Sequence, residues 1–271
     1  MNTTIHSGRN STLSLAGALA ALSGGAQAQC FDQIFGAPDA SNYLYFAAAL
    51  DVNGDWLFAG AAEHANGGIA GAGAVCVHHK VNGAWPQSQI LSDTNYPSFA
   101  AGFGQSLDSD GEWLAVGVPN FKLIENRDSE GAVLMFRRVG NAWKFNNYIL
   151  AQGQDLFSYA HFGQSVAMKG NRMAVGSSAS NGLVFVYRFT GTNWVLEHRI
   201  TNPTGSANAL FGRSVAIDGL NMLVVGAPGA TTAVPNSGAA YVYGFNAGAW
   251  GLYRGILRGL GIGQFPLGCQ L

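Results

Sequence analysis

The sequence has little charge, little proline and little cysteine. Of its 271 residues, 11% are charged, 8 are proline and 3 are cysteine. Because 48% of the residues are apolar, a disordered chain is excluded, and a net charge of −1 leaves no basic field for nucleic acid or an anionic membrane. Collagen is excluded because the glycines follow no three-residue period. Glycine itself is abundant: 38 residues, roughly twice the usual share, predict a globular chain with many tight turns.

The first 28 residues have the pattern of an export signal. A positive residue, Arg9, precedes the apolar stretch Leu13–Leu22, and an A-x-A site ends at Ala28. The stretch is too short to span a bilayer, so we predict cleavage after Ala28 and no transmembrane segment in the mature chain. A lipoprotein signal is disfavoured because Gln29, not a small residue, precedes Cys30. The expected location is secreted, periplasmic or on the cell surface.

A fourfold internal repeat dominates the rest of the chain. Similar segments open at Phe46, Phe103, Phe162 and Phe211, for example FGQSLDSDGEWLAVG in the second unit and FGQSVAMKGNRMAVG in the third. A second block in each unit runs from a glycine to a tryptophan 12 residues later. These pairs are Gly73–Trp85, Gly131–Trp143, Gly182–Trp194 and Gly238–Trp250. One spacing repeated four times indicates a repeat architecture.

Each unit contains four short runs with the composition of β-strands. In the second unit they begin at Gln105 and continue with Trp113–Val118, Ala132–Arg138 and Trp143–Leu150, separated by Gly, Asn and Asp. We therefore predict an all-β fold, a β-propeller of four-stranded antiparallel blades at about 46–102, 103–161, 162–210 and 211–257. The recurring Phe and Trp residues are expected to fill the space between blades rather than to stack on carbohydrate.

The segments that flank the four units do not make complete blades. Residues 29–45 hold a strand-like run, Cys30–Phe35, and a linker, and residues 258–271 begin another unit. We interpret the chain as an interrupted propeller rather than a closed four-blade ring. Exposed edge strands would then favour self-association.

The three cysteines allow two arrangements. Cys76 lies in an apolar strand and is expected to be a buried thiol. Export permits a disulfide between Cys30 and Cys269, near the two ends of the mature chain, and three free thiols are the alternative.

The repeated motifs resemble the FG-GAP repeat, which occurs in integrin α-subunit propellers and in many exported bacterial proteins. The fullest match is Phe211-Gly212 followed by Val225-Gly226-Ala227-Pro228, and the resemblance extends from about Phe46 to Trp250. Such propellers usually have about seven blades, so the resemblance implies a truncated seven-bladed propeller. It also implies adhesion or protein recognition, although fold alone does not establish function.

Calcium binding, which many FG-GAP repeats show, is not expected here. The nearest matches to a D-x-D/N-x-D-G loop are 51–55 and 108–112, and both lie in short turns with too few residues to surround the ion. The third unit has no acid at the equivalent place, 168–171. We predict hairpin turns, the calcium-free bacterial type of repeat, no metal and no cofactor.

The long, variable loops are expected to emerge on one face. In an antiparallel meander the loops between strands two and three lie on the same side as the connections between blades, and such a face suits recognition. We predict that it binds an extracellular protein or glycan. The candidate residues are Glu63, His64, Asn120, Lys122, Glu125, Arg127, Asp128 and His161. Solvated loops without a ligand are the alternative.

Catalytic motifs are absent from the sequence. It has no G-x-S-x-G, H-E-x-x-H, P-loop or C-x-x-C pattern. Adjacent strand residues such as His78 and His79 point to opposite faces, and Asp155 with His161 lacks a nucleophile. We predict a non-catalytic binding module. The alternatives are a propeller enzyme that hydrolyses or cleaves glycans, and a non-functional fragment of a longer propeller.

Overall fold

The chain folds almost entirely into β-strands. The structure is a computed structural model that describes residues 46–95, 100–124, 127–179, 181–206, 208–218, 221–231 and 235–257. All of them belong to one unit of the chain, Phe35–Leu271. Their regular structure consists of sixteen strands and one short 3-10 turn, η1, at Gly153–Asp155.

The strands form four antiparallel sheets, each made of four consecutive strands. The first sheet contains β1 (Phe46–Asn53), β2 (Trp56–Ala61), β3 (Ala74–His79) and β4 (Gln87–Leu91). The second contains β5 (Ser106–Asp110), β6 (Trp113–Val118), β7 (Ala132–Val139) and β8 (Ala142–Ile149). The third contains β9 (Phe162–Lys169), β10 (Arg172–Ser177), β11 (Leu183–Phe189) and β12 (Trp194–Thr201). The fourth contains β13 (Ser214–Ile217), β14 (Met222–Ala227), β15 (Ala239–Asn246) and β16 (Ala249–Leu257). The all-β class and the division into about four propeller-like blades are confirmed.

Tight turns join the first and second strands of the first two sheets. Asp110 pairs with Trp113, so Gly111 and Glu112 form the turn, and Gly111 has a φ of +59°. Gly54 has the same φ in the first sheet. Glycine adopts this left-handed conformation without a Cβ clash. The two stretches considered as calcium loops are therefore strand ends and turns. Across the described residues, no group of three or more His, Cys, Asp or Glu side chains is arranged to hold a metal ion.

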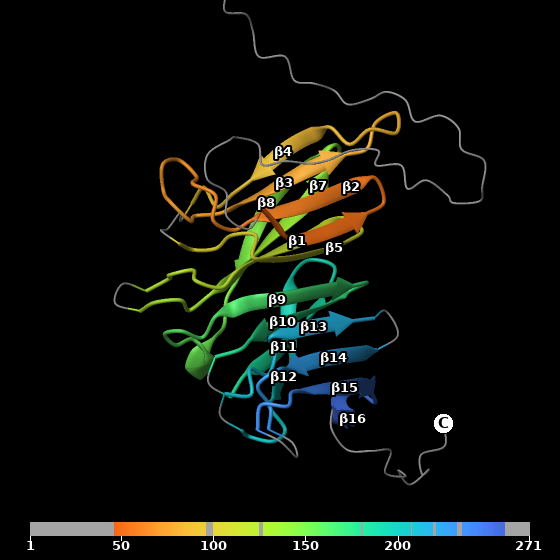
Figure 1. The fold of residues 1–271 in the computed structure, drawn as a ribbon. Helices are drawn as coiled ribbons and strands as arrows, with labels where there is room; N and C mark the ends of the chain where they lie inside the picture. The colour runs from red at the N-terminus through yellow and green to blue at the C-terminus, as the bar shows by residue number, and fades with distance from the viewer. Residues whose placement is uncertain are drawn as a thin grey trace, which may run out of the picture. The chain divides into compact units, whose positions relative to one another are not determined.

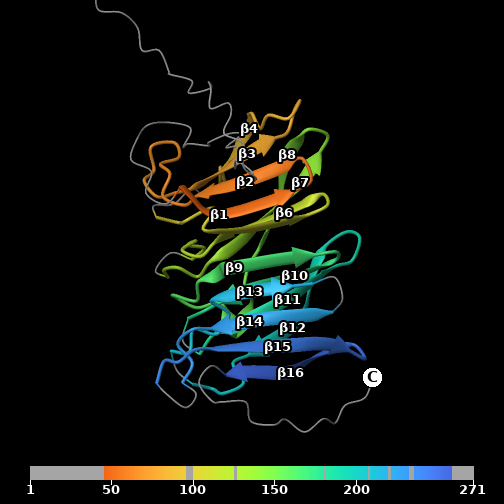
Figure 2. The same ribbon diagram turned by 45° about the vertical axis from the view of Figure 1, so that its right-hand side comes forward.

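Neighbouring sheets pack through their first strands. β1 contacts β5, β5 contacts β9, and β9 contacts β13; Figures 1 and 2 both show β9 and β13 side by side. Three hydrophobic clusters fill the three interfaces, and each combines residues of two successive sheets. Phe103, Phe162 and Phe211 are fully buried in them. Burial of one such side chain contributes about 2 kcal/mol, so the repeated phenylalanine is a packing residue.

The tryptophans of the outer strands β8, β12 and β16 pack toward the preceding sheet. Trp143 lies edge-on to Phe58 of β2, with ring centroids 5.1 Å apart, and Trp194 lies edge-on to Trp113 of β6 at 5.9 Å. Trp250 is also buried, but it meets the third sheet through Arg172, 5.6 Å from its ring centroid, and through Glu197. Edge-to-face geometry at these distances is favourable between aromatic rings. These three tryptophans therefore join sheets rather than present a surface for carbohydrate.

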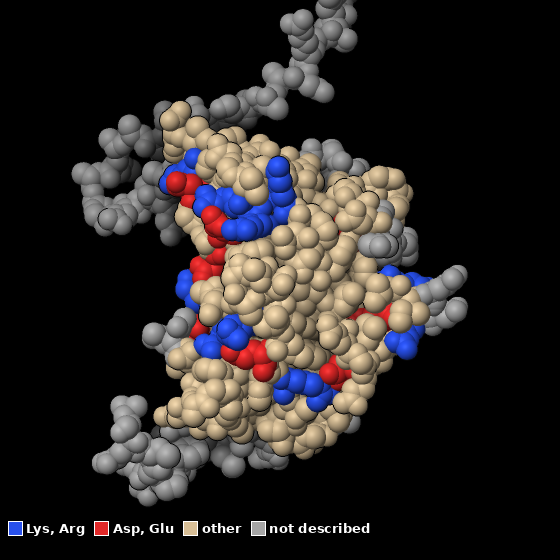
Figure 3. All heavy atoms as spheres, turned by 180° about the vertical axis from the view of Figure 1, so that it is seen from behind, with Lys and Arg blue, Asp and Glu red and all other residues tan. Residues whose placement is uncertain are grey.

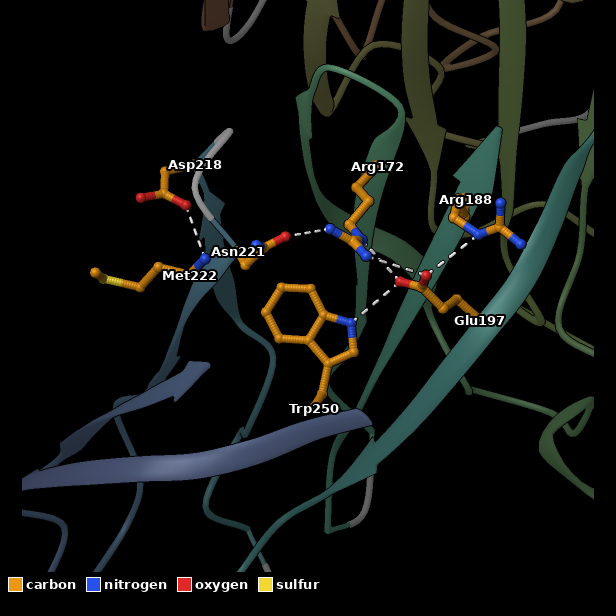
Figure 4. A network of polar contacts seen from close by, with 7 residues as sticks. All are labelled: Arg172, Arg188, Glu197, Asp218, Asn221, Met222 and Trp250. Atoms are coloured by element: carbon orange, nitrogen blue, oxygen red, sulfur yellow. Dashed lines mark hydrogen bonds and ion pairs between the residues drawn. The ribbon is translucent and has the colours of Figure 1, made fainter. Parts of the chain in front are cut away.

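A polar network joins the third and fourth sheets (Figure 4). Glu197 of β12 accepts hydrogen bonds from Arg172 Nε at 2.9 Å and from the Trp250 indole at 3.2 Å, and Arg188 Nε lies 3.3 Å from it. Burial would raise the pKa of Glu197, but the hydrogen bonds from Arg172 and Trp250 and the two arginine charges lower it. Arg172 also donates to the Asn221 amide oxygen.

Charged side chains are sparse on the surface. On the face that Figure 3 shows, Lys and Arg lie in small groups beside Asp and Glu, and uncharged residues cover most of the area. Exposed pairs of opposite sign, such as Arg137 and Glu112 at 3.1 Å, cancel locally. This face therefore has no extended field of one sign, in accordance with the net charge of −1.

Several predictions fall outside the described residues: the signal 1–28, the N-terminal strand 29–45, the tail 258–271 and the pair Cys30 and Cys269. Cys76 is a buried free thiol, and burial raises its pKa to about 11. Within the part of the chain that is described, no helix has the length and apolar character needed to cross a membrane.

Candidate functional site

A cavity of about 660 Å³ opens where the first, second and fourth sheets come together. Its polar side chains are Glu63, Gln105, Asn120 and Arg213, and alanine and glycine residues form the rest of its wall. We call this the axial cavity. Its small residues leave room for a ligand, while its polar groups come from three different sheets.

Two of the polar residues occupy the same position of the repeat. Gln105 and Arg213 each follow a Phe-Gly pair and stand directly before the first strand of their sheet, and Ala48 holds this position in the first sheet. All three line the axial cavity. Sequence reasoning missed Gln105 and Arg213. The F-G-x-S motif of the last three units has Gln, Gln and Arg at this position, so the sequence shows a polar residue there but not that two of the three meet in a cavity.

Glu63 and Asn120 were both predicted as ligand residues and line the same cavity. Each stands near the start of a long loop, Glu63 after β2 and Asn120 after β6. Asn120 is held in place because its Nδ2 donates to Ala100 O at 3.1 Å and its backbone N–H donates to Ala101 O at 3.2 Å. The structure thus brings together two candidates that are far apart in the sequence.

His161 lies beside the residues of the axial cavity. Burial lowers the pKa of its imidazole and the nearby Arg213 charge lowers it further, while a hydrogen bond accepted by the Pro119 carbonyl opposes them. Pro119 is next to Asn120 in the chain. The lowered pKa favours the neutral imidazole. His161 adjoins the cavity but is not among the residues that line it.

Lys122, Arg127 and Asp128 do not line the axial cavity. Lys122 Nζ lies 3.5 Å from Asp128 Oδ1, and Arg127 Nη1 donates to Leu156 O at 2.7 Å. Glu130, which was not predicted, is fully buried beneath them and accepts two backbone N–H groups of the same loop, at 2.7 and 3.3 Å. These contacts fix the conformation of the loop between β6 and β7 and attach it to the connection between β8 and β9.

The remaining candidates lie elsewhere. His64 is half-buried, and its backbone donates to Ala61 O at 3.0 Å and accepts from Gly73 N at 2.9 Å, closing the loop between β2 and β3. It is not among the residues that line the axial cavity. Glu125 lies outside the described residues.

A second cavity, of about 490 Å³, lies beside η1 and β12. In its wall Arg199 donates two hydrogen bonds to Asp155, at 2.7 and 2.6 Å. Asp155 therefore forms its ion pair with Arg199, and not with His161, which lies further along the same connection between β8 and β9. Burial and the Asp155 charge together raise the pKa of Tyr187. The pair braces η1 against the third sheet.

The family comparison bears on one of the repeats. Residues 194–243 match the model of the FG-GAP repeat. The chain carries an FG-GAP repeat. The match starts at the first residue of β12 and ends within β15, so the family's unit combines the outer strand of one sheet with three strands of the next. No curated protein matches this FG-GAP chain.

Two solved structures resemble the FG-GAP chain. A candidate 6-phosphogluconolactonase from Bacteroides uniformis has a TM-score of 0.49 and 10% identity, over 78% of this chain and 57% of that one. A Trypanosoma rangeli sialidase in complex with the inhibitor DANA has a TM-score of 0.45 and 12% identity, over 77% and 38%. The FG-GAP chain thus spans less than two thirds of either protein.

Proposed function

We propose that this FG-GAP chain is a non-catalytic, exported binding module that recognises an extracellular protein or glycan through its long-loop face. In this proposal a polar group of the ligand enters the axial cavity. The observation that supports it is the convergence of Glu63, Gln105, Asn120 and Arg213, from three sheets, on one cavity of about 660 Å³. Sites for small ligands have volumes of roughly 300–1,000 Å³ and a few convergent polar groups.

The polar groups of the axial cavity suit a ligand rich in hydroxyl groups. The amides of Gln105 and Asn120 both donate and accept hydrogen bonds, the Arg213 guanidinium only donates, and the Glu63 carboxylate only accepts. A sugar ring carries donors and acceptors around its whole edge and matches such a mixture. The alanine and glycine residues of the wall occupy little of the space in the cavity of about 660 Å³. A sugar residue of a glycan is therefore the favoured group.

Binding is favoured over glycan hydrolysis because glycosidases generally use a pair of carboxyl groups. Glu63 is the one acid among the described residues that line the axial cavity. His161, which adjoins it, is held in its neutral form by burial.

An array of glycans and extracellular proteins, probed with residues 29–271, tests this function. We expect a ligand whose affinity falls about tenfold or more in both Arg213→Gln and Glu63→Gln. Lys144→Gln is the matched control, because it removes a charge from an exposed position on β8 away from the cavity, and we expect no change. Turnover of a bound glycan, or binding that neither cavity variant weakens, would contradict the proposal.

A further inference from the structure

The backbone of each of the first three sheets contacts the Phe-Gly pair at the start of the next sheet. Gly131 forms a parallel bridge with Phe162, and the Phe162 N–H donates to Glu130 O at 3.1 Å. The first interface repeats the arrangement, with a parallel bridge between Gly73 and Phe103. The incoming phenylalanine is fully buried each time. This contact is the recurring joint of the fold.

The joint requires a glycine in each of the two sheets that meet there. A Cβ added to Gly117 would lie 2.1 Å from Gly163 O, and one added to Gly163 would lie 2.3 Å from Ala132 O. Neither contact is sterically possible without moving backbone. A hydroxyl completes the joint, because Ser106 Oγ donates to Gly163 O at 2.8 Å, and the next interface has an equivalent bond of the same length.

The fourth sheet has the same receiving groups, but among the described residues no Phe-Gly pair lies against them: the nearest atom to a Cβ added at Gly238 is Pro228 O, at 3.3 Å. Ser214, Gly226 and Gly238 bound a cavity of about 470 Å³, which we call the acceptor cleft. Ser214 Oγ stands over Gly226 as Ser106 Oγ stands over Gly117. The Ser214 hydroxyl has no hydrogen-bond acceptor among the described residues, whereas Ser106 has Gly163 O. Within the described part of the chain, the cleft therefore has the groups that receive a Phe-Gly pair but holds no such pair.

The described residues also leave the outer part of the same face exposed. Met222 begins β14 at the position that Trp113 holds in β6 and Arg172 in β10. Trp113 and Arg172 each contact the tryptophan of the following sheet, whereas 46% of the Met222 surface is exposed. The exposed Met222 side chain thus extends the acceptor cleft. In the earlier interfaces, the tryptophan of the following sheet packs at this position.

We propose that the acceptor cleft binds an extended segment with a Phe-Gly pair, such as the first strand of an FG-GAP repeat in a partner chain. The phenylalanine ring fills the cleft, its backbone bridges Gly238, and the Ser214 hydroxyl donates to the carbonyl of the partner's glycine. The argument is continuity with the earlier interfaces of this chain: the glycine–phenylalanine bridge forms at the first and second, and the serine–glycine hydrogen bond forms at the second and third.

A second copy of this chain is a poorer occupant. The first of its described strands, β1, begins with Phe46-Ala47 instead of Phe-Gly, although Ala47 has the required positive φ of +62°. A Cβ at the equivalent position of the three existing joints, Gly104, Gly163 and Gly212, would lie 2.3 to 2.6 Å from a carbonyl oxygen of the receiving sheet. The methyl group of Ala47 therefore blocks the approach.

Two peptides test the proposal directly. The probe is a labelled peptide of residues 101–110, AGFGQSLDSD, and its matched control carries Ala in place of Gly104. We expect the probe to bind the full chain with a Kd of about 100 µM or tighter in fluorescence polarisation, and the control to bind about tenfold more weakly or less. A photoreactive group in place of the Phe103 ring should crosslink to residues 226–240.

Protein variants locate the binding. Ser214→Ala removes an exposed hydroxyl and should weaken the probe about threefold to tenfold. Thr192→Ala removes an exposed hydroxyl from the turn between β11 and β12, and should leave binding unchanged. Equal binding of the two peptides, no binding at about 1 mM, or a crosslink outside the fourth sheet would overturn the proposal. Failure of the axial cavity variants would not affect this result, since the two sites share no lining residue.

Discussion

The indole Nε1 of Trp250 lies 3.2 Å from Glu197 Oε2, so the outer strand of the fourth sheet is hydrogen-bonded to the outer strand of the third. The Glu197 side chain is only 13% exposed and also meets Arg172 and Arg188. Between the earlier sheets the equivalent contact is a pair of aromatic rings. The outer strands of the last interface are therefore joined through one carboxylate instead of an aromatic pair.

Glu197→Gln should destabilise this interface. The amide keeps the shape of the side chain but loses the charge-assisted bonds, which are worth about 2 kcal/mol in a partly buried site. We expect a loss of that size in the free energy of unfolding, measured in urea. Glu112→Gln is the control, because its ion pair with Arg137 is exposed and should contribute under about 0.5 kcal/mol. Equal effects of the two substitutions would contradict the assignment.

The fold was predictable because its signals are local. The strand predicted at Trp113–Val118 has the observed bounds, and the strand predicted at Ala132–Arg138 ends one residue further on, at Val139. Apolar runs bounded by Gly, Asn and Asp specify both. The repetition of the second unit then extended the prediction to the other sheets.

The axial cavity was predictable only in part. Glu63 and Asn120 follow strand ends, so their place at the start of long loops could be inferred. Gln105 and Arg213 reach the cavity because the first strands of separate sheets converge, and that convergence is not encoded near either residue. The inner contacts of the loop that holds Lys122 and Asp128 depend on Glu130, whose burial has no local signature.

Cys76 should be unreactive in the folded chain. The thiol is fully buried, and burial raises its pKa to about 11, so little thiolate forms at pH 8. In a Cys30→Ser, Cys269→Ser background we expect no modification by a thiol reagent until denaturant unfolds the first sheet. Reaction at the rate of a free thiol in native buffer would contradict this burial.

Gly117→Ala should disrupt the joint between the second and third sheets. Its new Cβ would lie 2.1 Å from Gly163 O, a backbone atom that cannot yield without moving β9. We expect a loss of about 3 kcal/mol or more, or failure to fold, measured by thermal unfolding. Gly244→Ala is the matched control, because this strand glycine has no atom within 4 Å of the Cβ position. We expect the control to be neutral or slightly stabilising, and similar melting of the two variants would argue against the joint.

Asp108 should make the chain less stable as the pH rises. Burial raises the pKa of this carboxyl to about 6 and the charges of Asp51 and Asp110 add to this effect, although the Met168 N–H donates to Oδ2 at 2.6 Å. In the unfolded chain this carboxyl has its ordinary pKa of 3.8, so between pH 4 and 6 the folded chain retains a proton that the unfolded chain has released. The free energy of unfolding therefore falls across this window and then levels off.

Asp108→Asn removes the titration while keeping an oxygen that can accept the Met168 N–H. We expect the variant and the natural chain to unfold alike near pH 4, and the variant to be more stable by roughly 1–2 kcal/mol at pH 7. Urea unfolding at several pH values measures this difference. Stability curves that stay parallel from pH 4 to 7 would show that Asp108 does not titrate in this range. A natural chain that gains stability relative to the variant as the pH rises would mean that the Met168 hydrogen bond outweighs burial.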